Sequence, residues 1–133
     1  LQAWYYRRFA LDEPHLYRAM FGGEIGTGAH ETPEDVEAAL ATFVLLLDRI
    51  ERCDRAGRWQ VDDVALAGEV CWAMVHGFAG IELSGFFEDA GRDPRAAMSD
   101  AMRRIALGFG DDPAAVTEST DRARRRAARA ELL

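Results

Sequence analysis

The sequence predicts an all-α domain of about six helices, and two features of it carry this prediction. Apolar residues recur at spacings of three and four along most of the chain, which is the period of a helix with one buried face. Proline and glycine mark the boundaries between these stretches. With 133 residues, of which 49% are hydrophobic, the chain is long enough to form one domain with a real core.

Two helices are expected before the first long loop. Residues Leu1–Leu11 carry four aromatic residues that are distributed over more than one helical face. Pro14 suits the first turn of a short helix over His15–Phe21, which Gly22 and Gly23 end. The stretch Gly22–Glu31 contains four glycines and is predicted to be a flexible surface loop.

A long helix is expected to begin at Thr32 and Pro33, because a hydroxyl cap followed by proline is a strong start signal. Gly57 is a natural end. One face is predicted to be buried through Val36, Ala39, Leu40, Phe43, Leu47 and Ile50.

The next two helices are predicted to form a contact between subunits. From Asp62 to Leu83 apolar residues occupy nearly the whole helical circumference, so this helix must be covered on more than one side. In so small a domain the expected cover is a second copy of the chain. Asp93 and Pro94 begin a further helix with a narrow apolar stripe. The predicted interface residues of the homodimer are Val70, Met74, Phe78, Ile81, Met98, Met102, Ile105 and Phe109.

The last 23 residues, Asp111–Leu133, are rich in charge and alanine, with five arginines between Arg122 and Arg129. Glu118, Asp121 and Glu131 flank these arginines. We therefore expect a solvated helix or a partly disordered end rather than a nucleic-acid-binding arm.

Charge and composition exclude several functions. A net charge of −7 argues that this segment does not itself bind nucleic acid, since phosphate binding needs a basic surface. Cys53 and Cys71 lack metal-ligand spacing and are expected to be reduced thiols in a cytoplasmic protein. No signal-peptide pattern opens the chain, and charged or polar residues interrupt its most apolar stretch, so neither export nor a membrane span is expected.

Glu69, Trp72 and His76 are spaced three and four apart, so they share one sector of a helix. They can line a cavity, form part of a packed core, or serve a metal or catalytic role. His15 and His30 lie far away in sequence, and no serine has a nearby His and acid in a nucleophile arrangement. We expect no enzyme activity, no cofactor and no metal.

Aromatic and methionine side chains are unusually frequent in the first four predicted helices. Most such residues belong to cores, yet they also form adaptable walls around apolar ligands. We predict that an apolar or amphipathic small molecule binds within the bundle. The expected wall residues are Tyr6, Phe9, Tyr17, Met20, Phe43, Trp72 and His76.

Two segments resemble a known family. YRRFALDEPHLYRAMFG (Tyr6 to Gly22) and CWAMVHGFAGIELSG (Cys71 to Gly85) are similar to the C-terminal domain of TetR-type transcription regulators. The resemblance is to the subgroup named for a Trp, a His and a Gly, here Trp72, His76 and Gly77. It covers about Ala3 to Gly110, so we expect this domain over residues 1–110 and a separate tail over 111–133.

The resemblance implies a one-component regulator in which a helix-turn-helix head, absent from this chain, precedes a domain that binds an effector and dimerises. The family's four-helix dimer interface would map to Asp62–Leu83 and Pro94–Phe109. Effector binding would release operator DNA by population shift. Two alternatives stay open: a free-standing helical carrier or small enzyme that uses His76 and Glu69, and a dimerisation module without a ligand.

Overall fold

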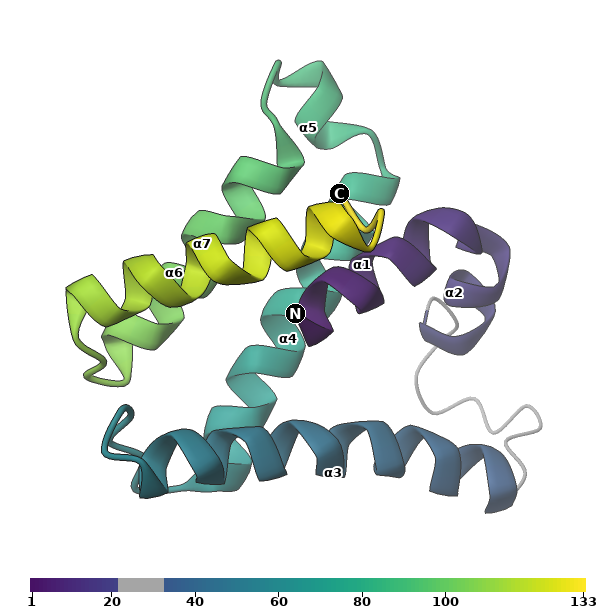
Figure 1. Cartoon of the computed structure of the whole chain (residues 1–133). Helices are drawn as coiled ribbons and strands as arrows, with labels where there is room; N and C mark the ends of the chain where they lie inside the picture. Colours follow the sequence, from purple (N-terminus) through teal and green to yellow (C-terminus); the bar gives the residue numbers. More distant parts are fainter. Residues whose placement is uncertain (22–32) are drawn as a thin grey trace.

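The computed structural model describes residues 1–21 and 33–133, and every regular element in these ranges is a helix (Figure 1). The predicted all-α class is confirmed. About six helices were expected, and the described residues form seven, because a four-residue helix follows the central one. The helices are α1 Gln2–Asp12, α2 Pro14–Phe21, α3 Pro33–Arg55, α4 Val64–Leu83, α5 Phe86–Asp89, α6 Pro94–Gly108 and α7 Pro113–Arg129.

Aspartate caps begin three of these helices. The Asp63 carboxylate accepts a hydrogen bond from the Leu66 amide at the start of α4. Asp93 and Asp112 cap α6 and α7 in the same way, and each is followed directly by proline. The aspartate carboxylate accepts a hydrogen bond from a backbone amide of the first turn, which has no partner within the helix. Proline has no backbone N–H, and at the first helical position no N–H is needed for a helical hydrogen bond. These local signals explain why the predicted helix starts were accurate.

Helix α4 is the central element. It crosses α3 at one end, and α1 with α2 lies on one side of it while α6 with α7 lies on the other (Figure 1). Three groups of buried residues join the helices. Trp4 and Met98 pack with Ala127 and Leu132, Ala10 and Tyr17 pack with Ala79, and Ile50 packs with Ala67 and Cys71.

An ion pair and a backbone hydrogen bond connect the segment between α3 and α4 to the segment between α6 and α7. The Arg58 guanidinium donates to both carboxylate oxygens of buried Asp111, with distances of 2.6 Å and 2.9 Å. The Gln60 amide donates to the Phe109 carbonyl at 2.7 Å. Arg58 holds the pKa of Asp111 below its ordinary value through the hydrogen bonds it donates, so this bridge is charged at neutral pH.

The tail forms a helix, which is one of the two expected alternatives, but one face of this helix packs against the rest of the chain instead of being solvated all round. Val116 and Ala127 of α7 are buried, and the chain then turns at Glu131, whose φ is 56°. The turn lets the Leu132 amide bond the Ala127 carbonyl at 2.9 Å and places the Leu132 side chain in the core. The charged residues of α7 occupy its outer face, and small or branched residues fill the inner one.

Three expectations fall outside what the structure describes: the glycine-rich loop Gly22–Glu31, the capping hydroxyl of Thr32, and the burial of the Val36, Ala39 and Leu40 side chains. Within the described ranges, α4 is the one helix long and apolar enough to cross a membrane when length and composition alone are judged. The core helix of a soluble protein meets the same criterion.

Candidate functional site

Five aromatic rings from three helices meet on one side of α4. Tyr6 comes from α1, and Tyr17 and Phe21 lie one turn apart on α2 with ring centroids separated by 5.3 Å. Trp72 and His76 lie one turn apart on α4 with centroids separated by 4.6 Å. In both helices the four-residue spacing puts the two rings on the same face, so α2 and α4 present matched aromatic pairs to each other.

His76 lies at the centre of this cluster. Its ring centroid is 4.4 Å from that of Phe21 and 4.7 Å from that of Tyr6. The Tyr6 hydroxyl lies 3.0 Å from Nδ1 and 2.9 Å from Nε2 of the imidazole. The two nitrogens point in different directions, so one hydroxyl can bond only one of them at a time. The Tyr17 hydroxyl donates to the His76 carbonyl oxygen at 3.2 Å, which ties α2 to the backbone of α4.

Burial sets the protonation of this cluster. It lowers the pKa of His76 below its ordinary value of 6.5, because the imidazolium loses solvation. It also raises the pKa of Tyr6 well above its ordinary value, with the neighbouring Tyr17 phenol adding to the effect. At neutral pH both groups are therefore uncharged. The Tyr6–His76 pair can donate or accept a hydrogen bond without placing a net charge in an apolar wall.

A groove of about 640 Å³ opens between α2 and α4 beside the cluster. From α2 it is lined by Tyr17, Arg18, Met20 and Phe21. From α4 it is lined by Trp72, His76, Gly77, Gly80, Leu83 and Ser84. Aromatic and apolar side chains predominate, and the Arg18 guanidinium is the charged group of the lining.

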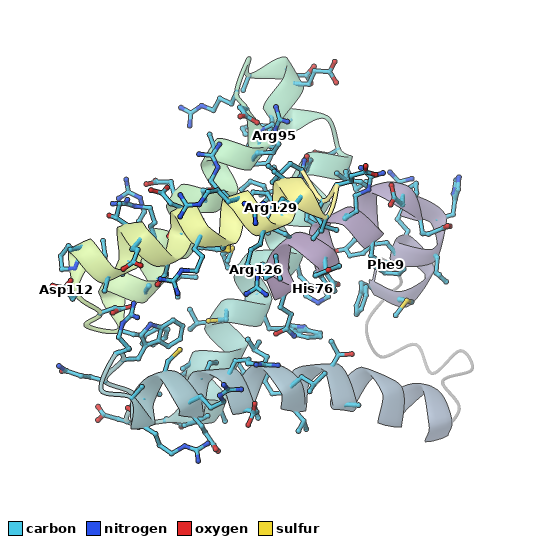
Figure 2. The ribbon with its side chains drawn as sticks, viewed as in Figure 1. Phe9, His76, Arg95, Asp112, Arg126 and Arg129 are labelled. Atoms are coloured by element: carbon cyan, nitrogen blue, oxygen red, sulfur yellow. The ribbon has the colours of Figure 1, made fainter. Side chains whose placement is uncertain are left out.

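The seven predicted wall residues occupy different places. Tyr17, Met20, Trp72 and His76 line the groove, and Tyr6 lies behind it against His76. Phe43 reaches Trp72 from α3, with a ring distance of 5.5 Å and perpendicular planes. Phe9, seen near the α1–α2 junction in Figure 2, packs instead against the core group of Ala10, Tyr17 and Ala79.

Sequence reasoning left the role of one residue, Glu69, open and overlooked others. Glu69 was grouped with Trp72 and His76, but it is exposed and does not line the groove. Arg18 and Phe21 were not among the expected wall residues, although Phe21 follows Tyr17 by one helical turn, and that spacing could have revealed it.

The predicted interface residues divide into exposed and packed groups. Val70 and Ile81 on α4 are 44% and 45% exposed. Phe78 stacks on Phe87 at 4.7 Å, and Phe109 stacks on Trp59 at 4.9 Å. Met74 is half-buried, and Met102 and Ile105 are half-buried against the core groups. Met98 is fully buried within this chain, so it is a core residue and cannot lie on a surface between subunits.

The family comparison agrees with this arrangement of helices. The sequence profile of the family described as "Tetracyclin repressor-like, C-terminal domain" matches residues 2–105. The chain belongs to this TetR-like family. C-terminal domains of TetR-like regulators typically dimerise and bind small-molecule ligands. Membership in the subgroup named for Trp, His and Gly stays a prediction.

Neither a search of curated proteins nor a search of solved structures found a match. The TetR-like match includes α1 to α5 and most of α6, and therefore every residue that lines the groove. It ends before α7, so the arginine-rich helix is additional to the matched region.

Proposed function

We propose that this chain is the ligand-sensing and dimerisation domain of a cytoplasmic bacterial TetR-like regulator. The observation that carries the proposal is the groove between α2 and α4, whose aromatic lining includes the uncharged His76, with the Tyr6 hydroxyl hydrogen-bonded to its ring from behind. Its volume lies within the range of about 300–1,000 Å³ that is usual for small-molecule sites.

The lining favours an apolar or amphipathic effector with an aromatic part. Phe21, Trp72 and Tyr17 offer ring faces and edges for stacking, and Met20 provides a wall that adapts to different shapes. The neutral imidazole of His76 can orient a polar group by a hydrogen bond, and Arg18 supplies a positive charge for an acidic one. Recognition would thus combine apolar burial with one or two directed polar contacts.

The regulatory mechanism we propose is population shift. A helix-turn-helix head, connected upstream of α1, would bind operator DNA as a dimer and repress transcription. A ligand in the groove contacts α2 and α4 together, and so favours one relative position of these helices. A difference of about 1–3 kcal/mol between two states changes operator affinity by one to two orders of magnitude. The ligand would release the repressor from DNA in this way.

A thermal-shift screen of apolar and amphipathic compounds tests the sensing role. A ligand at 100 times its dissociation constant should stabilise the fold by about 2.7 kcal/mol. Phe21→Ala and His76→Ala should weaken the effect of each compound that binds. Tyr5→Ala is the matched control, because Tyr5 is an aromatic residue of α1 that is 53% exposed and does not line the groove.

A dimerisation module without a ligand is the second candidate, and the exposed Val70 and Ile81 side chains favour it. It replaces the sensor if no compound in the screen raises the melting temperature while the protein is dimeric. Specific footprinting of an operator by this chain alone would contradict both candidates, since neither assigns DNA binding to this chain.

A further inference from the structure

Two glycines of α4 form part of the groove wall. Gly77 and Gly80 line the groove together with Ser84, and their spacings of three and four residues put all three on one face of α4. A Cβ atom added to either glycine would meet no atom of the described residues within 4 Å. Packing among the described residues therefore does not require glycine here, although glycine inside a helix is less stable than alanine.

The missing side chains leave the backbone of α4 open to a ligand. Glycine is the residue that lets a ligand approach a backbone closely. Between Gly77 and Ser84 the helix rises by about 10 Å. The Ser84 hydroxyl donates to the Ile81 carbonyl oxygen at 2.7 Å, so it is already engaged by the helix itself. This face of α4 therefore offers an uncharged strip on which a flat molecule can lie.

Aromatic rings adjoin one end of the strip. His76 directly precedes Gly77, and its ring centroid lies 4.6 Å from that of Trp72 and 4.4 Å from that of Phe21. All three rings are partly buried, so each keeps part of its surface accessible from the groove. An aromatic ligand can stack on these rings while its plane rests on the strip. The lining thus favours a flat aromatic body.

Arg18 gives the groove a charge of one sign. It is the one charged side chain among the described residues that line the groove. The side chain is exposed at the groove edge and forms no ion pair or hydrogen bond with another described residue. An anion at the edge would gain a guanidinium partner without breaking an existing contact, whereas a cation would meet no carboxylate in the described lining.

We propose that the effector is an amphipathic aromatic anion, whose flat body lies on Gly77 and Gly80 and whose carboxylate or sulfonate group binds Arg18. The inference rests on the proposed function and names the class of molecule that the groove detects. The aromatic body is buried between α2 and α4, and the acidic group stays at the exposed edge, where it keeps part of its hydration. The planar guanidinium can donate to two acid oxygens, which a neutral analogue does not provide.

Two fluorescent probes with the same ring system test the preference for an anion. 8-Anilino-1-naphthalenesulfonate is negatively charged, and N-phenyl-1-naphthylamine is its neutral counterpart without the sulfonate. Arg18→Gln should weaken binding of the sulfonate by at least about threefold and leave the dissociation constant of the neutral probe unchanged. Added salt should weaken the sulfonate more in the wild type than in Arg18→Gln. Arg49→Gln is the matched control, because Arg49 is also exposed but lies on α3 outside the groove.

Gly77→Ala and Gly80→Ala test the strip. Each should raise the melting temperature, because alanine has the higher helix propensity and its methyl group meets no described atom. The methyl group should nevertheless weaken both probes by at least about fivefold, since it occupies the space of the ligand. A gain in stability with a loss of binding excludes misfolding as the cause. Gly108→Ala on α6, outside the groove, should leave both dissociation constants unchanged.

Two kinds of result would overturn the proposal while the sensing role stands. Equal binding of the two probes with no effect of Arg18→Gln would remove the preference for an anion, as would a thermal-shift screen in which only neutral or cationic compounds bind. Unchanged probe binding in the glycine variants would remove the strip, and so would a loss of binding that accompanies a change of mass in sedimentation equilibrium. If neither probe nor any screened compound binds, the sensing role itself fails and the proposal with it.

Discussion

Arg7 of α1 and Glu82 of α4 form a two-pronged ion pair inside the domain, with Nε–Oε2 and Nη2–Oε1 distances of 2.7 Å and 2.5 Å. The two side chains are only 7% and 10% exposed. The guanidinium also lies 5.9 Å from the centre of the Trp4 ring, and its buried Nη1 has no hydrogen-bond partner among the residues that the structure describes. The pair fixes how α1 crosses α4, and with it the position of Tyr6 beside His76.

Breaking this pair should destabilise the fold strongly. Removing one partner leaves the other charge buried and uncompensated, which typically costs about 3–5 kcal/mol. We expect Arg7→Met and Glu82→Leu each to lower the free energy of unfolding in urea by an amount of this order. The double variant Arg7→Met/Glu82→Leu should recover most of the loss. Additive losses in the double variant would show that packing, not charge, accounts for the effect.

The lowered pKa of His76 should make the free energy of unfolding depend on pH. Burial lowers the pKa of His76 in the folded state, so between that value and 6.5 the unfolded chain binds more protons than the folded one. The stability that the neutral imidazole contributes is complete above 6.5 and is lost as the pH falls below it. Urea unfolding at pH 7.5 and pH 5.5 should therefore show a larger loss for the wild type than for His76→Gln. Equal losses would mean that the imidazole titrates normally in the fold.

Local signals in the sequence predicted the helices well because they act within one turn. The Asp93–Pro94 pair is followed by α6, and Pro33 begins α3, at the expected positions. Tertiary contacts carry no such signal. Arg7 and Glu82 are 75 residues apart, and no local pattern in the sequence pairs them.

The site was also predicted only in part, because helical spacing relates residues within one helix but not residues on different helices. Helical spacing identified Trp72 and His76 as neighbours, and the structure brings Tyr17 and Met20 beside them. The spacing could not show how α1 lies between α2 and α4, where Phe9 packs against the core group of Ala10, Tyr17 and Ala79. It also could not separate Glu69 from Trp72, because residues three apart share a sector but one of them can lie at its exposed edge.

Gly68 should tolerate only small side chains, because α3 packs directly on it. An added Cβ would lie 2.4 Å from Leu47 Cδ2 and 3.2 Å from Phe43 Cζ. Leu47 can move aside for alanine, but valine should overpack this crossing and cost about 1–3 kcal/mol. Because Phe43 contacts Trp72, the emission of Trp72 should shift as well. Gly108→Val is the control, since a Cβ at this position meets no atom of the described residues within 4 Å. A Gly68→Val protein no less stable than Gly108→Val would show that the α3–α4 crossing accommodates the larger side chain, since valine does not lower helix propensity relative to glycine.

The final turn of the chain should contribute to stability through the Trp4 core. Leu132 is 6% exposed and packs with Trp4, Met98 and Ala127, so Leu132→Ala should cost about 2–5 kcal/mol in urea unfolding. The same turn needs a positive φ at Glu131, which glycine adopts without strain. Glu131→Gly should therefore stabilise the fold by up to about 1 kcal/mol. Removing residues 111–133 should expose the Trp4 indole and shift its emission to longer wavelengths, whereas Arg124→Ala, on the outer face of α7, should leave it unchanged. A truncated protein with wild-type stability and Trp4 emission would show that residues 111–133 do not contribute to the core and form only a solvated end of the chain.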